Sequence, residues 1–124
     1  MNYFLNEEQK EIKEISRKVA EEKIKPIRAK YDEEGLFPNE IVEVLAQTDL
    51  FAVLVPEEYD GISGSVTDLA IVTEELSRVC GGIGLALGAT GLGMYPILIA
   101  GSKEQKEKYL PAIADGEKLA AFAL

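Results

Sequence analysis

The stretch from Val79 to Ser102 contains no charged residue, and this feature limits what the chain can fold into more than any other. It also holds six glycines between positions 81 and 93. A run of this length could cross a lipid bilayer. Six glycines together with Pro96 make a poor membrane span, however, because both residue types weaken a helix. We therefore expect a buried central helix of a soluble bundle, with no membrane as a partner.

Three of these glycines share one helix face. Gly84, Gly88 and Gly91 are separated by four and three residues, which is the spacing of neighbours on a helix surface. A glycine inside a helix costs up to about 1 kcal/mol relative to alanine, so something is expected to lie close to this face. Two explanations stay open: close packing of another helix, or a groove for an apolar ligand.

Amphipathic segments precede the charge-free stretch. Asn6 and Gln9 have the spacing of a capping box, and apolar residues recur at helical intervals past Pro26 to about Tyr31. We therefore expect one long first helix with a kink at the proline. A short second helix is expected from Asn39.

A third helix is expected from Ser65, with Glu74 and Glu75 on its solvated face, and a last one from Ser102. The apolar run 51–55 is either a strand or a buried connector, since periodicity does not separate the two. The predicted fold class is all-α: an orthogonal or up-down bundle of about five helices, with the glycine-rich segment as the most buried one.

Composition excludes several classes of function. The net charge of −9 argues against a nucleic-acid partner, whose phosphates require a basic surface. The chain has no histidine, and its single cysteine, Cys80, cannot form an internal disulfide. No metal site and no catalytic constellation is recognisable. The acidic N-terminus lacks the features of a signal peptide, so a cytoplasmic location is expected, or the mitochondrial matrix if a presequence has been removed.

Several segments, in order, resemble one protein family. The opening FLNEEQKEIKEISRKVAEEKIKPIRAKYDEEGLFP, the loop VPEEYDGISGS and the segment VTEELSRVCGGIG are similar to parts of the N-terminal helical domain of the FAD-dependent acyl-CoA dehydrogenases. The most specific match is GMYPILIAGSKEQKEKYLPAIADGEKLAAFAL. In the loop, Asp60 replaces the family's first glycine. The resemblance covers residues 1–124 as this one domain, with the chain ending at the start of a β-domain that is missing.

The resemblance implies a reaction. In this family a carboxylate removes the α-proton of an acyl-CoA thioester, the β-hydrogen leaves as hydride to FAD, and an electron-transfer flavoprotein reoxidises the flavin. The catalytic glutamate is usually carried by the C-terminal domain, so no residue here is assigned that role. Phe122 and Leu124 align with the start of the flavin-contacting segment. Leu87, Gly88 and Leu92 align with the wall of the acyl pocket.

The family resemblance also implies partners. The whole enzyme is expected to be a homo-oligomer, and Ile12, Leu50, Ile62 and Val72 occupy positions that receive an apolar anchor of the electron-transfer flavoprotein. Ordinary core packing is the alternative for these four residues. Two other functions stay open: a helical binding module without catalysis, and a family relative that oxidises a substrate other than acyl-CoA.

Overall fold

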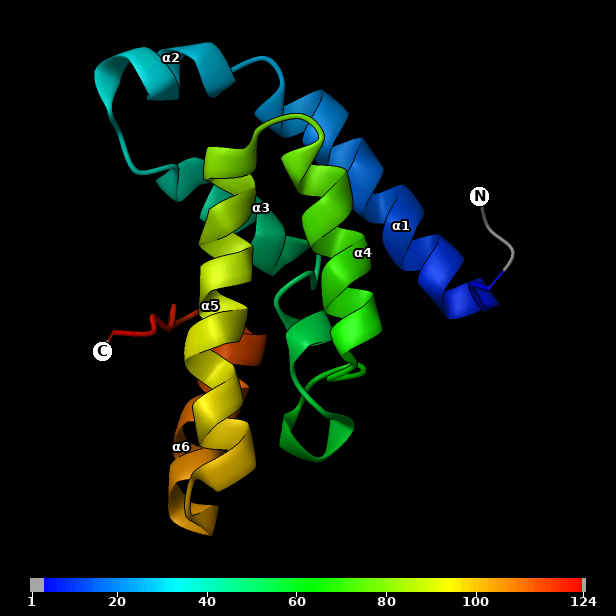
Figure 1. Ribbon diagram of the computed structural model, residues 1–124, viewed down its shortest axis with the longest axis vertical. Helices are drawn as coiled ribbons and strands as arrows, with labels where there is room; N and C mark the ends of the chain where they lie inside the picture. Colours follow the sequence, from blue (N-terminus) through cyan, green and yellow to red (C-terminus); the bar gives the residue numbers. More distant parts are fainter. Residues whose placement is uncertain (1–3, 124) are drawn as a thin grey trace.

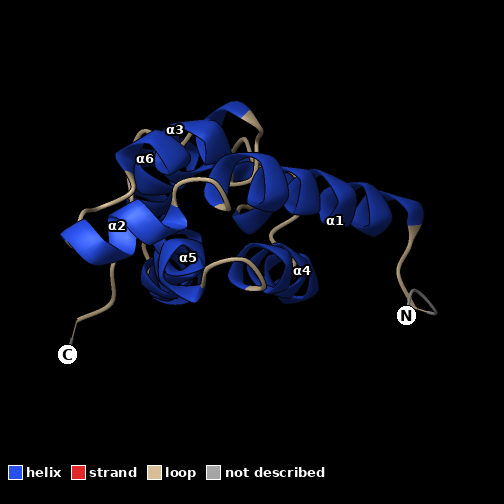
Figure 2. Ribbon diagram, turned by 90° about the horizontal axis from the view of Figure 1, so that it is seen from above, coloured by secondary structure: helices blue, strands red, loops and turns tan. Residues whose placement is uncertain are grey.

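The computed structural model describes residues 4–123, and within that range all regular secondary structure is helical, with no strand. The all-α prediction is confirmed. Six α-helices are joined by one π-helical segment and two 3-10 turns; α4 and α5 run side by side, and α1 lies at an angle to them (Figures 1 and 2). The elements are α1 (Glu7–Val19), η1 (Ala20–Ile24), α2 (Arg28–Glu34), α3 (Asn39–Gln47), η2 (Ala52–Leu54), η3 (Glu57–Tyr59), α4 (Val66–Ser77), α5 (Gly81–Ala100) and α6 (Lys103–Ala114).

The first predicted helix is correct at its start and wrong in its continuity. Asn6 and Gln9 form the expected capping box of α1. Instead of a kinked helix reaching Tyr31, the backbone widens into the π-helical η1, in which the Lys25 N–H bonds to Ala20 O at 2.9 Å. A turn at Pro26 then separates η1 from α2, because proline has no N–H to continue the ladder. This break is why the structure has six α-helices.

The apolar run whose structure the periodicity left open is a buried connector. Residues 50–55 are all buried, and η2 lies within them. The connector packs between α4 and α6, so it forms the centre of the core. After it, Gly61 and Gly64 let the loop fold back closely, since a Cβ on Gly61 would lie 1.8 Å from Val55 O.

The glycine face of α5 packs against α4. A Cβ added to Gly84 would lie 2.6 Å from Ser77 Oγ, and one added to Gly91 would lie 3.1 Å from Leu69 Cδ2. The corresponding distance from Gly88 to Thr73 Cγ2 is an ordinary 3.7 Å. Close helix packing therefore accounts for Gly84 and Gly91, which leaves no ligand groove between these two helices at those positions.

The expectation that α5 would be the most buried segment is wrong. Its fully buried side chains lie on one face at Ile83, Leu87, Thr90 and Met94, while Leu85, Leu92 and Ile99 are well exposed. By length and composition α5 could cross a membrane, and it is the one helix of residues 4–123 that meets that test. Its buried face packs into the bundle, against α3, α4 and α6.

The chain ends by crossing α5. After α6, whose capping box at Ser102 and Gln105 forms as its sequence indicates, the extended segment 117–123 passes over Gly93. A Cβ on Gly93 would lie only 2.5 Å from Ala121 N, so only glycine permits this crossing. Figure 1 shows the C-terminal segment leaving the bundle beside the middle of α5.

Candidate functional site

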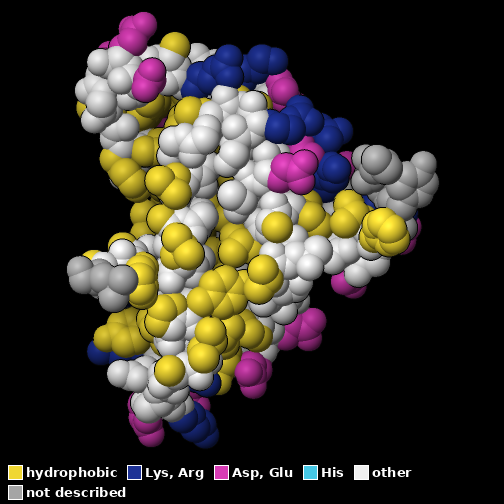
Figure 3. Space-filling model, in the orientation of Figure 1, with side chains coloured by type: hydrophobic (Ala, Val, Ile, Leu, Met, Phe, Trp, Pro, Cys, Tyr) yellow, Lys and Arg dark blue, Asp and Glu magenta, His cyan; other side chains and the backbone are white. Residues whose placement is uncertain are grey.

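The exposed side of α5 carries large apolar side chains. Leu85, Leu92 and Ile99 are seven residues apart and therefore lie on one face, opposite the face that joins the core. Hydrophobic side chains also gather over α5 in the space-filling view (Figure 3). A contiguous exposed apolar surface of this kind marks a binding site or an interface.

A groove lies between the N-terminal half of α5 and the loop that connects α2 to α3. We call it the α5 groove, and its volume is about 480 Å³. Every lining side chain is uncharged and nearly all are apolar, so the groove can accept a hydrocarbon group but cannot transfer a proton. Its lining residues are Gly35, Leu36, Phe37, Pro38, Gly82, Leu85, Ala86 and Ala89.

The structure separates the three predicted acyl-pocket residues. Leu92 lies on the exposed apolar face of α5, and Gly88 is partly buried opposite Thr73. Leu87 has no exposed surface and belongs to the core. The groove itself is lined by Leu85 and Ala89, which are two positions before and after Leu87 and therefore point to a different side of the helix.

The α2–α3 loop contributes to the groove in a way that the sequence did not predict. Leu36 and Phe37 are about half exposed, although both are large and apolar. They follow Gly35, the left-handed C-cap of α2, which turns the chain toward α5. A signal was present: the second face of α5, read at a seven-residue spacing through Leu85 and Leu92, is as apolar as the core face.

The predicted flavin-contacting residues lie at the chain's C-terminal end. Phe122 is 56% exposed on the extended segment that crosses α5 at Gly93. Leu124 is outside the described residues. An exposed aromatic ring on extended backbone can pack against a flat ring system, so Phe122 fits an apolar contact with a flavin. It supplies no charge for a phosphate.

The four predicted docking residues differ in accessibility. Ile62 is 47% exposed and Ile12 is partly buried. Leu50 and Val72 are fully buried in the core. Ile12 and Ile62 can therefore contact a partner, whereas Leu50 and Val72 lie beneath the surface.

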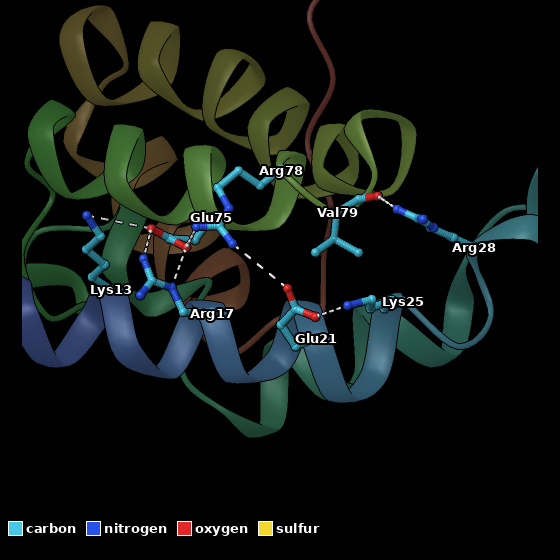
Figure 4. Close-up of polar contacts among 8 residues, drawn as sticks. All are labelled: Lys13, Arg17, Glu21, Lys25, Arg28, Glu75, Arg78 and Val79. Atoms are coloured by element: carbon cyan, nitrogen blue, oxygen red, sulfur yellow. Dashed lines mark hydrogen bonds and ion pairs between the residues drawn. The ribbon is translucent and has the colours of Figure 1, made fainter.

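The expectation of a solvated face at Glu74 and Glu75 is correct for Glu74 and wrong for Glu75. Glu74 is exposed, but Glu75 keeps only 2% of its surface exposed. Arg17 on α1 donates two hydrogen bonds of 3.0 Å to the two carboxylate oxygens of Glu75. Figure 4 shows Lys13 and Arg78 converging on the same carboxylate, at 3.7 and 3.6 Å.

The protonation of Glu75 follows from these neighbours. Burial opposes its charged form, but the hydrogen bonds and charge of Arg17, with the charges of Arg78 and Lys13, outweigh that effect and lower the pKa of the carboxyl. A carboxylate held in this way is a structural ion-pair partner. It bonds to α1 and does not line the α5 groove, so it is no candidate for acid–base catalysis there.

A second groove, of about 370 Å³, lies between α1 and α3. Its apolar floor includes Ile15 and Val44, and both cations and carboxylates stand at its edge. None of the predicted site residues lines it. Within residues 4–123, no group of three Asp, Glu or Cys side chains could hold a metal ion.

The comparisons with known proteins decide the family. Residues 6–117 match the family model described as acyl-CoA dehydrogenase, N-terminal domain. This chain belongs to the acyl-CoA dehydrogenase family. The match extends from the capping box of α1 to the start of the C-terminal segment, and thus includes the α5 groove.

Three relatives illustrate the similarity. The short-chain specific acyl-CoA dehydrogenase of Clostridium acetobutylicum is 40% identical over all of this chain and 33% of its own length. A chain in the structure described as the electron transferring flavoprotein of Acidaminococcus fermentans, in work on flavin-based electron bifurcation, superposes with a TM-score of 0.88 at 31% identity, over 96% of this chain and 32% of its own. The acyl-CoA dehydrogenase of Bacillus anthracis complexed with FAD gives a TM-score of 0.83 at 33% identity, over 94% of this chain and 20% of its own.

The chain spans only part of its relatives, about a third of the length of the Clostridium enzyme. The matched part is the helical domain described above.

Proposed function

We propose that this chain is the N-terminal domain of a flavoenzyme that α,β-dehydrogenates acyl-CoA thioesters, and that the domain provides one wall of the acyl pocket. The observation that carries the proposal is the α5 groove. Its lining is apolar and free of charge, as a site for a hydrocarbon chain requires. The family match and the short-chain specificity of the Clostridium relative support the same substrate class.

The residues divide the work in this proposal. Leu85 and Ala89 contact the acyl chain from α5, while Leu36 and Phe37 close the groove from the loop. Leu92, two turns after Leu85, extends the same exposed apolar face of α5 beyond the groove. The contribution of the groove residues is to exclude water from the acyl chain of the substrate, because burying apolar surface favours binding by about 0.8 kcal/mol per methylene group. The base that removes the α-proton belongs to another part of the enzyme.

FAD is the proposed cofactor, and one residue of the described chain fits it. Phe122 and, by alignment, Leu124 would contact the flavin ring, which accepts the hydride from the β-carbon when it is bound. The relative from Bacillus anthracis was solved with FAD, which supports this assignment. Phosphate-binding residues are expected elsewhere, because this segment offers apolar contacts.

The groove can be tested by filling it. In the whole flavoprotein, Ala89→Phe places a ring in the α5 groove and should lower kcat/KM for acyl-CoA thioesters by about tenfold or more, since pocket contacts of a few methylenes carry that much discrimination. Ala100→Phe, at the exposed end of the same helix, is the control. Activity is followed by anaerobic bleaching of the oxidised flavin on adding butyryl-CoA and longer acyl-CoAs.

Two results would contradict the proposal in different ways. If no acyl-CoA bleaches the flavin of the unmodified protein, the reaction is wrong. If bleaching occurs but Ala89→Phe behaves like Ala100→Phe at every chain length, the reaction stands and the α5 groove is not the acyl pocket.

We further propose that the electron-transfer flavoprotein docks between α1 and α4. Ile12 and Ile62 are the accessible predicted residues, and the similarity to a chain from the electron transferring flavoprotein work supports this partner. Ile62→Glu should slow electron transfer to the flavoprotein and leave flavin reduction by acyl-CoA unchanged. Ile62→Val, which stays apolar, should behave as the unmodified protein. Equal loss of both half-reactions in Ile62→Glu would argue against docking at this residue.

The assembly and location of the whole protein are also proposals. We infer a homo-oligomer, since the exposed apolar side chains of α5 form a surface that a further subunit or domain would cover. A cytoplasmic enzyme, or one of the mitochondrial matrix after removal of a presequence, agrees with the acidic N-terminus. Size measurement of the whole flavoprotein would test the assembly: a monomeric mass would contradict it.

A further inference from the structure

Polar side-chain contacts contribute much of the attachment of α1 to the rest of the domain. Only Ser16 and Val19 of its thirteen residues are fully buried, and its main packing partner is α4. Beyond Val19 the chain enters the core, because Ala20 and Ile24 of η1 have almost no exposed surface. α1 is therefore anchored in the core at its C-terminal end, and along the rest of its length Ile12 is the one partly buried apolar side chain that packs against the core.

Two buried carboxylates of α4 hold the exposed part of α1. Asp68 accepts a 2.8 Å hydrogen bond from Gln9 Nε2, and its other oxygen accepts one from Ser63. Seven residues later, Glu75 accepts both bonds from Arg17 (Figure 4). The spacing of Asp68 and Glu75 places them on one face of α4, matching Gln9 and Arg17 on α1. We call Asp68 and Glu75 the carboxylate clasp.

The clasp covers an apolar residue. Val72 lies between Asp68 and Glu75 in sequence, four residues after one and three before the other, and therefore shares their face of α4. It has no exposed surface. Because Asp68 and Glu75 bond to α1, this face of α4 is turned toward α1, and movement of α1 away from α4 would reduce the cover over Val72, one of the docking positions predicted from the sequence.

We propose that α1 opens away from α4 as a unit, pivoting at η1, and that the carboxylate clasp sets how often it opens. Segments with few buried apolar contacts open locally at a lower free energy than the core does. Removing one partner of a buried ion pair is strongly destabilising, because the remaining charge stays buried without compensation. The consequence for partner docking rests on the proposed function, whereas the opening itself does not.

Acid should favour the open form. The charged groups that face Glu75 are Lys13 and Arg17 from α1 and Arg78, the C-cap of α4. Glu21 of η1 is paired to Arg78 beyond them, and α5 and η2, which pack against α4 elsewhere, carry no charged residue. Protonation of Glu75 removes the charge that holds all three cations. Because the pKa of Glu75 is lowered in the folded state, its ion pairs with α1 are present at neutral pH and are lost as pH falls through that lowered value.

Hydrogen exchange resolved by peptide, in the whole protein, tests the opening. Glu75→Gln should lower the protection factors of amides in residues 7–19 by about tenfold or more, with those of α5 unchanged. Glu74→Gln is the matched control, since Glu74 is exposed and adjacent on the same helix. Acidification of the unmodified protein should lower the same protection factors, and Glu75→Gln should reduce that response.

The outcomes separate the proposal from its alternatives. Unchanged protection of residues 7–19 in Glu75→Gln would overturn it, and so would an equal fall across α1, α4 and α5. If Glu75→Gln does not fold, Arg17→Gln, in which the change lies on a half-exposed side chain, decides by the same comparison. Failure of the Ile62 docking experiment leaves these exchange results unaffected, so the two ideas can fail separately.

Discussion

Two buried hydroxyl groups in this domain lack a hydrogen-bond partner among the described residues. Tyr95 Oη and Thr73 Oγ1 are covered and have no hydrogen-bond partner within the described part of the chain. Burial, together with the charge of Asp68, raises the pKa of the Tyr95 hydroxyl. A buried polar group without a partner costs about 1–3 kcal/mol, so these two atoms lower the stability of the fold.

Removing one of these hydroxyls should stabilise the protein. We expect Tyr95→Phe to raise the free energy of unfolding by about 1 kcal/mol, because the ring stays packed and the uncompensated hydroxyl is lost. Tyr31→Phe is the control, since the Tyr31 hydroxyl donates a 2.9 Å hydrogen bond to Glu40 and should give no such gain. Chemical denaturation measures both. A loss of stability in Tyr95→Phe would show that its hydroxyl has a partner.

Glu75 predicts the response of stability to acid. Its pKa is lower in the folded than in the unfolded chain, so its contribution is present at neutral pH and disappears as pH falls through the folded value. The free energy of unfolding should therefore fall on acidification, and less steeply in Glu75→Gln. Denaturation measured over a series of pH values, with Glu74→Gln as control, checks this. Equal slopes in all three proteins would rule out the assigned role.

At the scale of elements, α5 is a helix with three different faces. One joins the core, one is narrowed by glycines so that α4 can approach, and one presents leucines to the outside. The helix is apolar all round because two of these faces are buried against the core and against α4, and the third is an exposed apolar surface of the kind that binds a ligand or another protein surface. The same pattern in a membrane helix would have a lipid-facing surface in place of the third face.

The glycine contacts predict opposite effects for two similar substitutions. Gly84→Ala should destabilise the protein by about 1–3 kcal/mol, because its methyl group would overlap Ser77. Gly88→Ala has room at 3.7 Å and should be neutral or stabilising by up to about 1 kcal/mol, since alanine is the better helix former. Thermal unfolding compares them. Similar losses in both variants would mean that α4 and α5 approach more evenly than described.

For the whole molecule, the crossing of the C-terminal segment over α5 links the bundle to the proposed flavin contact. Gly93 is the point where the backbone of residues 120–121 touches the helix, and Phe122 follows directly. The position of Phe122 therefore depends on a helix that also lines the α5 groove. Acyl and flavin contacts would in this way share one structural support.

Blocking that crossing should affect the cofactor more than the fold. Gly93→Ala would push the C-terminal segment off α5, since the methyl group would lie 2.5 Å from Ala121 N. In the whole flavoprotein we expect weaker retention of FAD, read from the fluorescence of released flavin, with helix content unchanged by circular dichroism. Gly88→Ala on the same helix should retain FAD normally. Normal retention of FAD in Gly93→Ala would show that Phe122 does not contribute to flavin binding.

Local sequence was enough to predict much of the helical framework. The caps at Asn6, Ser65 and Ser102 form as expected, because capping depends on residues three apart in the chain. The prediction of Asn39 as the N-cap of the second helix is wrong, since Asn39 lies inside α3 and Pro38 precedes it at the cap without a side-chain hydrogen bond. Most of the charge-free stretch forms the single helix α5, and the segment 56–64 is a loop that contains only the 3-10 turn η3. The family resemblance, carried by the segment that ends in FAL, is confirmed by the match over residues 6–117.

Tertiary structure decided what each helix face meets. Glu74 and Glu75 are chemically identical neighbours, yet Glu74 is solvated and Glu75 is buried. The difference arises because α1 packs against the side of α4 that carries Glu75 and places Arg17, 58 residues earlier in the sequence, beside its carboxylate. Leu87 joins the core while Leu85 lines a groove, since only the placement of the α2–α3 loop distinguishes the sides of an all-apolar helix. Periodicity describes a helix relative to itself, whereas burial, pairing and grooves depend on partners distant in sequence.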